Sequence, residues 1–321
     1  MAPPEIRPFD DEHLDGAARL LAARQAAHRA AEPLLSSQFE DAAAARREIA
    51  ALWSEEGASG AVALRDGRVV AYVVGVGRAE EIWGPNVWVE SAGHATVDAE
   101  DIRDVYAPAA ERWVEEGRTR QYVLAPATDS ALVEAWFRLC FGQQQAHAVR
   151  ETSGAEPAIP RGFEIRPPAL DEVEQLVELD LALPRHQQLA PVFSTLTLPS
   201  RDEARAEWEK TLAESDEHIL IAYRDGRPLA CWSVVDFGRS RHNEGVMQLE
   251  GTAYLGFAVT LPEARGSGIG TALTEASLAW AATEGFRAMV TDWRVTNLLA
   301  SRFWPARGFR TAFVRLYRSI P

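Results

Sequence analysis

A short glycine-rich loop, Arg265-Gly-Ser-Gly268-Ile-Gly270, separates an apolar run, 255–259, from a segment with helical spacing of its apolar residues, 271–284. A turn from a strand into a helix points several backbone N–H groups at one place, and the helix dipole adds positive charge there. Glycine lets a phosphate approach the backbone where a Cβ would otherwise stand, and Arg265 supplies a charged donor. The residue types and their spacing therefore predict a phosphate-binding loop.

Two other interpretations of this loop are weaker. A glycine-rich turn without a ligand does not explain so extreme a composition. A nicotinamide-dinucleotide site would use Gly266 and Gly268, with Asp292 as the acid that binds the ribose, but Thr271 stands where the third glycine or alanine belongs. That motif also opens a doubly wound domain, and only about fifty residues follow it here, too few for the further strand–helix units.

The loop resembles the Arg/Gln-x-x-Gly-x-Gly/Ala motif of the general N-acetyltransferase (GNAT) superfamily. The apolar run that ends at residues 257–259 precedes it, as the fourth strand does in that family. A second motif of the family, Asn-x-x-Ala before an aromatic residue and Gly-Phe, is similar to residues 297–300 and 308–309. The resemblance is clear over residues 250–315.

What the resemblance implies is an N-acetyltransferase that transfers an acetyl group directly from acetyl-CoA, its co-substrate, to an amine of a small molecule, without a metal. A non-catalytic acyl-CoA-binding sensor or interaction protein is the alternative. In the family, acyl-CoA lies in a V-shaped split between the fourth and fifth strands. By resemblance, the cofactor-binding residues are Phe257, Ala258, Val259, Arg265, Gly266, Ser267, Gly268, Ile269, Gly270, Thr271, Asn297 (which also fits a helix cap), Ser301 and Trp304.

The groups that would move protons depart from the family pattern. The family often places a tyrosine acid just before Gly-Phe, where this chain has Trp304, and an indole N–H is no usable acid at neutral pH. Glu250, ahead of the fourth strand, is the candidate catalytic base by resemblance, although most Glu side chains are simply solvated. Asp292, His242 and bulk water are the other candidate proton acceptors.

The chain contains two copies of one plan. Residues 5–8 (EIRP) recur as residues 164–167, and residues 65–68 (RDGR) recur as residues 224–227. Both recurrences have the same offset, because 164 minus 5 and 224 minus 65 are each 159. Two recurrences at one spacing indicate an internal duplication at the scale of a domain.

Each copy predicts the same order of elements. Apolar runs flank both Asp-Gly pairs, which is a hairpin pattern, and helical patterns precede the hairpins over 11–53, 171–181 and 201–214. A strand, a helix, a strand, a helix and a last strand follow each hairpin. The predicted fold class is α/β (α+β): two tandem GNAT-like domains, each a mixed, mostly antiparallel sheet flanked by helices.

The predicted domain division follows the duplication. A degenerate GNAT-like domain without the acyl-CoA loop covers 1–151, and the acetyltransferase domain covers 163–321. Between them, residues 152–162 are rich in Pro, Gly and small residues, which is typical of a linker.

The first domain has lost the loop. The corresponding segment, 97–104, has no glycine, and Asp98, Glu100 and Asp101 stand where a pyrophosphate would bind. Carboxylates suit a helix N-terminus, and Asp98 is a good N-cap. They would repel a phosphate by about 1–4 kcal/mol per charge pair at 4 Å in wet surroundings. This domain is therefore predicted not to bind acyl-CoA, but to shape the active cleft or to form a dimer surface.

Composition sets the remaining expectations. The 321 residues carry a formal net charge of -14, which argues against nucleic acid or an anionic membrane as partner. A monomer and a homodimer are both left open. The amino terminus lacks the regions of a signal peptide, and no apolar run reaches membrane-spanning length, so a cytoplasmic protein is expected. Cys140 and Cys231 lie in different halves and form no metal or disulfide pattern; Cys231, in an apolar strand, is predicted to be core.

Overall fold

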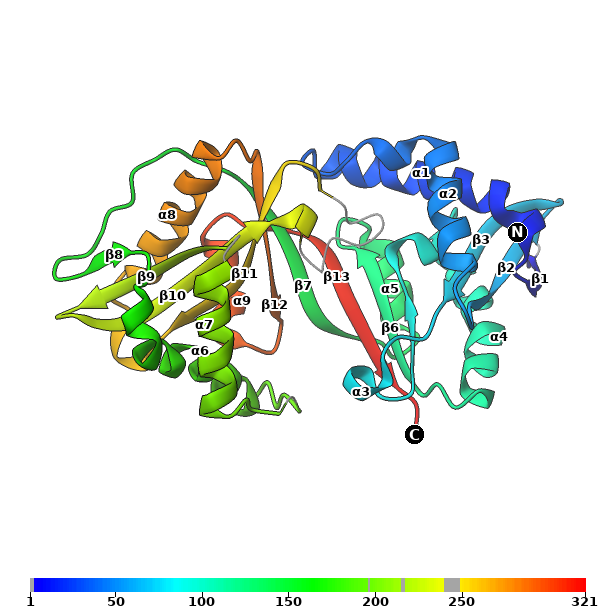
Figure 1. The fold of residues 1–321 in the computed structure, drawn as a ribbon. Coiled ribbons are helices and arrows are strands. Elements are labelled where there is room, and N and C mark those ends of the chain that lie inside the picture. The colour runs from blue at the N-terminus through cyan, green and yellow to red at the C-terminus, as the bar shows by residue number, and fades with distance from the viewer. Residues whose placement is uncertain (1–2, 196, 215–216, 240–248) are drawn as a thin grey trace. The chain divides into compact units, whose positions relative to one another are not determined.

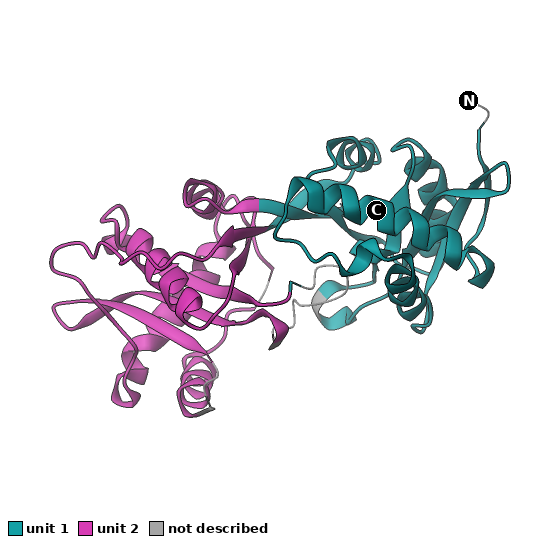
Figure 2. Ribbon diagram, turned by 90° about the horizontal axis from the view of Figure 1, so that it is seen from above, with its two compact units in different colours: residues 1–147, 243–249, 311–321 teal, residues 148–242, 250–310 magenta. Residues whose placement is uncertain are grey.

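The structure is a computed structural model that describes residues 3–195, 197–214, 217–239 and 249–321. The chain forms two compact units (Figures 1 and 2). Unit 1 comprises residues 1–147, 243–249 and 311–321, and unit 2 comprises residues 148–242 and 250–310. Each unit therefore contains sequence from both halves: the last strand of the chain belongs to unit 1, and residues 148–151 of the first half belong to unit 2.

Unit 1 contains two groups of strands. The first has the order β1-β2-β3-β5 and consists of β1 (Glu5–Pro8), β2 (Ser59–Arg65), β3 (Arg68–Gly75) and β5 (His94–Thr96). The second has the order β4-β6-β13-β7 and consists of β4 (Asn86–Val89), β6 (Arg120–Pro126), β13 (Arg310–Ser319) and residues 142–147 of β7 (Gly142–Glu151). β4 and β6 are parallel, whereas β6 and β13 are antiparallel.

Two layers of helices cover the central hairpin of unit 1, since successive side chains of a strand point to opposite faces. Val62 and Tyr72 pack with α1 (Leu14–Ala31) and α2 (Ala42–Trp53). Ala63 and Val73 pack with residues of α4 (Asp101–Glu115) and α5 (Ser130–Phe137). The short helix α3 (Glu80–Trp83) lies between β3 and β4 in the chain.

Unit 2 has the strand order β7-β12-β11-β10-β9-β8. Its strands are residues 148–151 of β7, β8 (Glu164–Arg166), β9 (His218–Arg224), β10 (Arg227–Asp236), β11 (Thr252–Thr260) and β12 (Ala288–Arg294). Its helices are α6 (Val173–Gln188), α7 (Arg201–Glu214), α8 (Ile269–Thr283) and α9 (Leu298–Ala306). Only β11 with β12 is parallel among the strand pairs whose register is defined in this unit. The predicted fold class is confirmed for both copies.

Both predicted hairpins are present, with tight turns at the Asp-Gly pairs. Arg65 pairs with Arg68 across the first turn and Arg224 with Arg227 across the second. The two turn residues have φ values of 53° and 70° in the first hairpin and of 52° and 73° in the second. Positive φ at both central residues defines the turn that matches the twist of antiparallel strands, and Asp-Gly favours it.

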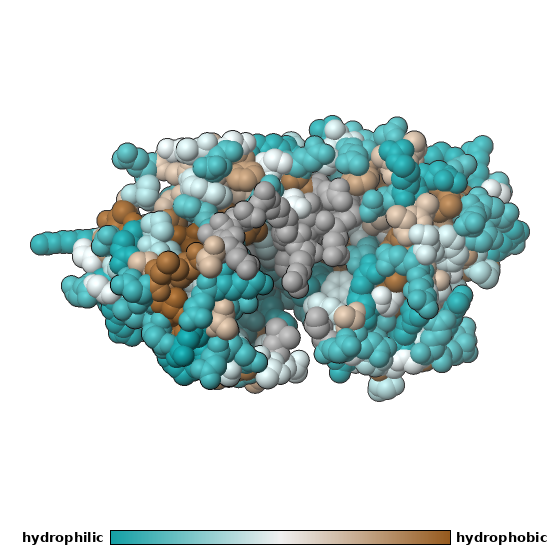
Figure 3. All heavy atoms as spheres, in the orientation of Figure 1, coloured by the Kyte–Doolittle hydropathy of each residue, from teal (hydrophilic) through white to brown (hydrophobic). Residues whose placement is uncertain are grey.

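The face of the molecule in Figure 3 is mostly hydrophilic, with apolar residues at separate places. This agrees with the net charge of -14. No helix among the described residues is long and apolar enough to cross a membrane. Cys231 is fully buried, as predicted, and burial raises the pKa of its thiol, so it has no character of a nucleophile.

Candidate functional site

Strands β11 and β12 run side by side only over their first residues. β11 pairs in parallel with β12 from Thr252 to Leu255, which lies opposite Thr291. From Phe257 to Thr260, its defined pairing is with β10. The two strands therefore part after Leu255, which gives the split that the resemblance implied between the fourth and fifth strands of this copy.

A pocket of about 450 Å³ lies along this split, and all its lining residues belong to unit 2. Residues of α6, β10, β11, α8, α9 and the glycine-rich loop form its walls. Most of the predicted cofactor-binding residues line it, namely Ala258, Val259, Arg265, Gly266, Gly268, Ile269, Gly270, Thr271, Asn297 and Trp304. The structure thus brings together residues that are up to 46 positions apart, Ala258 and Trp304 being the ends of the set.

Three of the predicted residues do not line the pocket, and each contributes to its framework. Phe257 packs against the core between the sheet and helices α6 and α7. The hydroxyl of Ser267 donates a 2.7 Å hydrogen bond to the carbonyl of Ala264, inside the loop. The hydroxyl of Ser301 donates a 2.7 Å hydrogen bond to the carbonyl of Val295, before α9.

The loop has the backbone shape that its glycines allow. Gly266 and Gly268 have φ values of 75° and 88°, and Gly268 is the N-cap residue of α8. A Cβ at Gly266 would meet nothing within 4 Å, and one at Gly268 would meet only Cγ of Pro160, at 3.5 Å. The N–H groups of the first turn of α8 have no carbonyl one turn earlier to bond to. An anionic group can therefore reach this end of the helix.

Two arginines border the pocket. The Nε of Arg265 donates to the carbonyl of Thr260 at 3.1 Å, which ties the start of the loop to the end of β11. The guanidinium of Arg307 donates to the hydroxyl of Thr271 and lies 5.4 Å from the ring centre of Phe303. Two cations thus line the pocket near the helix N-terminus, which suits a phosphate ligand.

Helix α9 forms the wall opposite β11. Its N-cap is Asn297, whose side chain accepts a 3.3 Å hydrogen bond from the N–H of Ala300, so the helix-cap role is confirmed. Nε2 of His186, on α6, lies 3.4 Å from Oδ1 of the same side chain. Trp304 is 5% exposed, and its ring centre lies 5.3 Å from that of Phe309. Trp304 is therefore a packing residue at the base of this wall.

Glu250 lies away from the pocket. It stands in the turn before β11, its side chain is exposed, and its backbone carbonyl accepts a 3.2 Å hydrogen bond from Arg287. It comes before the first residue of β11, Thr252, and the six strand residues from there to Ala258 span about 20 Å at 3.3 Å per residue. The other loop candidate, His242, lies outside the described residues.

A tyrosine–carboxylate pair marks the point where the strands part. The hydroxyl of Tyr254 donates a 2.5 Å hydrogen bond to Oδ1 of Asp292. Tyr254 precedes the last residue of β11 that pairs with β12, and Asp292 follows the last residue of β12 that pairs with β11. The sequence contained both residues, but no spacing rule indicates that two strands joined by a helix bring these side chains together.

A bulge in β11 makes room for this pair. Ser233 and Val234, adjacent on β10, lie opposite Phe257 and Leu255, so Gly256 is the extra residue. A Cβ at Gly256 would stand 2.7 Å from Cε1 of Tyr254. Any other residue type at this position would force the tyrosine ring or the strand to shift.

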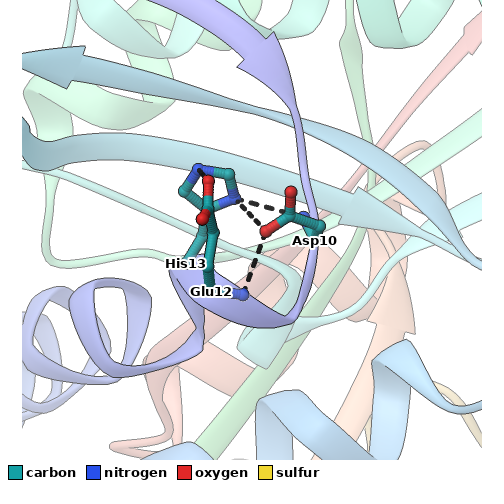
Figure 4. Close-up of side chains that lie close together, drawn as sticks. All are labelled: Asp10, Glu12 and His13. Carbon is teal, nitrogen blue, oxygen red and sulfur yellow. Dashed lines mark hydrogen bonds and ion pairs between the residues drawn. The ribbon is translucent and has the colours of Figure 1, made fainter.

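Figure 4 shows a second group of polar side chains, Asp10, Glu12 and His13, in unit 1. Their ligand atoms lie within 4.8 Å of one another. Oδ1 of Asp10 accepts the N–H of Glu12 at 2.9 Å and lies 2.9 Å from Nδ1 of His13. These contacts form a capping box at the short helix that leads into α1. In unit 2, the N–H of Ala169 donates to the carboxylate of Glu172 at 2.7 Å in the corresponding place, so the group is explained as a helix cap.

Comparison with known proteins agrees with this architecture. The model of the acetyltransferase (GNAT) family matches residues 185–309, so the chain contains a GNAT acetyltransferase domain in its second half. No curated protein sequence matches the chain.

Solved structures extend the likeness over both units. A GCN5-related N-acetyltransferase from Sphaerobacter thermophilus is 15% identical, with a TM-score of 0.57 over 98% of this chain and 95% of its own. A glucosamine N-acetyltransferase region of a fungal multi-domain β-N-acetylglucosaminidase is 14% identical, with a TM-score of 0.52 over 99% of this chain and 38% of its own. A tandem GNAT protein from the clavulanic acid biosynthesis pathway is 17% identical, with a TM-score of 0.48 over 98% of each chain. The first two likenesses show the GNAT fold over nearly the whole chain.

Proposed function

We propose that this protein is an acyl-CoA-dependent N-acyltransferase, which transfers the acetyl group of acetyl-CoA to an amine of a small molecule. The observation that supports this most is the pocket of unit 2, where two parting strands meet a glycine-rich turn and a helix N-terminus. All of these elements lie inside the segment matched by the GNAT family model. The net charge of -14 favours a cationic acceptor, which an amine is at neutral pH.

Successive parts of the pocket would bind successive parts of acetyl-CoA. Gly266, Gly268 and the first turn of α8 would hold the pyrophosphate. The backbone of β11 at Ala258 and Val259, beyond the last residue that pairs with β12, would bind the amide groups of the pantetheine arm, with α9 on the other side. This arrangement would place the thioester towards Leu255, where the strands part.

Direct transfer forms a bond between the amine nitrogen and the thioester carbon and breaks the carbon–sulfur bond. The amine must lose a proton, and the leaving thiolate must gain one. We propose Asp292 as the proton acceptor, because it lies at the opening of the split and the hydroxyl of Tyr254 fixes its position. A thiol has a pKa of about 8.5, so water can protonate the leaving thiolate near neutral pH. Trp304 in place of a tyrosine acid therefore does not prevent transfer.

Release of free thiol from acetyl-CoA in the presence of a broad panel of amines tests the proposal. With an accepted amine, Asp292→Asn is expected to lower turnover by about 100-fold or more, because a positioned base contributes that much. The dissociation constant for acetyl-CoA should stay unchanged in this variant, since Asp292 lies apart from the phosphate loop. Tyr254→Phe, which keeps the ring and loses the hydroxyl, should have a smaller effect on turnover and alter its pH profile.

The second candidate function is an acyl-CoA-binding sensor, and Trp304 is the observation that favours it. A protein that binds acetyl-CoA but releases no thiol with any amine of the panel would be such a sensor. A protein that binds no acetyl-CoA would contradict both functions.

A further inference from the structure

A second pocket, of about 490 Å³, adjoins the first one within unit 2. It is lined by Arg150, Thr271, Glu275, Ala306, Arg307 and Gly308. Thr271 and Arg307 line both pockets, so the two share a wall at the first turn of α8 and the end of α9. A ligand that leaves the phosphate loop along this wall enters the second pocket.

Arg150 comes from the first half of the chain. It stands on the last four residues of β7, which belong to unit 2. The next residues fix this segment in the unit: Glu151 makes two 2.8 Å hydrogen bonds with Arg310, and the N–H and hydroxyl of Thr152 donate to the carbonyls of Arg287 and Phe286 at 3.2 Å and 2.8 Å. Farther along the same segment, Pro160 lies beside Gly268. The segment that links the two halves therefore borders the phosphate loop and the second pocket.

The hydrogen bonds of Arg150 hold its guanidinium between two helices. It donates to both carboxylate oxygens of Glu275, on α8, at 3.0 Å and 3.3 Å. It also donates to the backbone carbonyl of Arg307, just after α9, at 2.7 Å. The side chain of Arg150 is 20% exposed, and that of Glu275 is 26% exposed. The cation is thus positioned in advance and remains open to the pocket.

The second pocket carries a net positive charge. Arg150 and Arg307 contribute two cations, and Glu275 is the one acid among its lining residues. The hydroxyl of Thr271 faces the same space and already accepts a hydrogen bond from Arg307. In a chain with a net charge of -14, a pocket with two guanidinium groups is suited to an anion. A guanidinium group can bind a phosphate through two hydrogen bonds at once.

We propose that this second pocket binds the 3′-phosphorylated adenosine of acyl-CoA, with Arg150 as the residue that selects for the 3′-phosphate. The inference rests on the proposed function, in which the glycine-rich loop holds the pyrophosphate. Acyl-CoA carries one more phosphate beyond the pyrophosphate, on the ribose, and the second pocket begins where the loop ends. The first half of the chain thus supplies a specificity residue to the site of the second half. Acyl donors that end in phosphopantetheine lack this phosphate and are bound more weakly.

The test is the ratio of two dissociation constants, that of 3′-dephospho-CoA divided by that of CoA, measured by calorimetry on the full chain. In the wild type this ratio is expected to be about tenfold or more, the effect of one charge-assisted contact to phosphate. Arg150→Gln should bring the ratio close to one by weakening the binding of CoA alone. Glu275→Gln should raise the ratio several-fold, because it removes the carboxylate that competes with the phosphate for Arg150.

Arg310→Gln is the matched control. It also removes one arginine of a two-hydrogen-bond ion pair, beside the same strand, but Arg310 lines neither pocket. The ratio should remain that of the wild type, and thermal unfolding should show that both variants are folded. A wild-type ratio of one, or an Arg150→Gln variant that weakens both ligands equally, would overturn the assignment of the 3′-phosphate. Failure of the wild type to bind either ligand would instead overturn the proposed function.

Discussion

The N-termini of helices α4 and α8 occupy the same place in the two copies and have opposite chemistry. Each helix ends before a glycine with positive φ, 81° at Gly117 and 84° at Gly285, so the two elements correspond closely. At the start of α4, the carboxylate of Asp101 accepts hydrogen bonds from Arg65 at 2.9 Å and 3.2 Å. At the start of α8 stands Gly268, with an open space for a ligand. One helix end is neutralised from within the chain, and the other is left for an outside anion.

The turn before α4 shows how the first copy uses its acids. Glu100 is the N-cap residue of the helix and forms ion pairs with Arg103 and Arg138. Oδ1 of Asp98, predicted as the helix cap, instead accepts the N–H of Glu100 at 3.0 Å and so closes the preceding turn. Each predicted acid therefore has a structural partner in unit 1.

In unit 1, side chains close the corresponding split, between β5 and β6. Nε2 of His94, on β5, lies 2.9 Å from the carbonyl of Leu124, on β6. Arg24 donates to the carbonyl of His94 at 2.5 Å and to the hydroxyl of Ser91 at 3.0 Å. The ring of Trp136 packs edge-on against His94, with 5.7 Å between ring centres. Side chains thus fill in unit 1 the region that the pocket occupies in unit 2.

Trp304 has a counterpart in unit 1, which explains its presence. Trp136 and Phe141 have ring centres 5.1 Å apart at 76°, and Trp304 and Phe309 have ring centres 5.3 Å apart at 79°. Both tryptophans are buried. The same aromatic pair therefore closes the same helix onto the last strand in both copies, so the tryptophan belongs to the shared architecture and does not by itself report a loss of catalysis in unit 2.

A carboxylate at the start of α8, like the one at the start of α4, should remove the ability of unit 2 to bind acetyl-CoA tightly. Gly268→Glu places a carboxylate at the start of α8 and forces a residue with a Cβ to adopt φ 88°. Strain of about 1–2 kcal/mol and charge repulsion of about 1–4 kcal/mol should weaken acetyl-CoA binding by about 100-fold or more, measured by calorimetry. Gly285→Glu, at the other end of α8, imposes similar strain at φ 84° in open space and should leave binding unchanged. Equal loss in both variants would mean that helix stability, and not the phosphate, causes the effect.

Stability at low pH should depend on buried histidines in both units, among them His28 and His94 in unit 1 and His218 in unit 2. Burial, together with the nearby Arg24, lowers the pKa of His28 to about 4 and that of His94 to about 3, both in unit 1. The folded state therefore keeps these rings neutral, whereas the unfolded chain takes up protons below about pH 6.5. This contribution to stability is complete above that pH and falls as the pH drops, down to about pH 4 for His28 and about pH 3 for His94, with a loss of about 2 kcal/mol per histidine at pH 5.

Denaturant unfolding at pH 7 and pH 5 measures this loss. His28→Gln should reduce the difference between the two pH values by about 2 kcal/mol, even though it lowers stability at both. In unit 2, burial lowers the pKa of His218 to about 4, so local hydrogen exchange is needed to assign the loss to each unit. An unchanged difference in His28→Gln would show that this histidine is protonated in the folded state.

The number of acetyl-CoA molecules bound per chain tests whether unit 1 differs from unit 2. We expect one acetyl-CoA per chain by calorimetry, because unit 1 has an acidic helix N-terminus and a filled split. Replacement of Asp98, Glu100 and Asp101 by serine removes only the first barrier, so the stoichiometry should stay at one. A second site in this variant would show that charge alone separates the two units. Two equivalent sites in the wild type would refute the distinction altogether.

Local signals predicted much of this fold. The Asp-Gly turns, the helices before them and the glycine-rich turn into α8 are each specified by a few adjacent residues, and the structure has them where the spacing placed them. The exchange of last strands could not be predicted, because β7 and β13 are both ten-residue strands with similar burial patterns, and local sequence does not distinguish which unit each one joins. The same holds for Tyr254 with Asp292 and for Arg150 with Glu275, which meet only through strand pairing. The position of Pro160, in the predicted linker, beside Gly268 is likewise not specified by adjacent residues.

The smallest expected effect concerns Glu250, for which resemblance and geometry differ. The resemblance makes it the base, whereas its exposed side chain stands in the turn before β11, five residues before Leu255. Glu250→Gln should therefore change turnover by less than about twofold across the acidic limb of the pH profile, while Asp292→Asn shows the loss expected for a base. The two substitutions remove one carboxylate each, so a general effect of net charge would appear in both. A flattened acidic limb in Glu250→Gln alone would place the proton acceptor before β11, and the Tyr254–Asp292 hydrogen bond would then hold the two strands together at the point where they part.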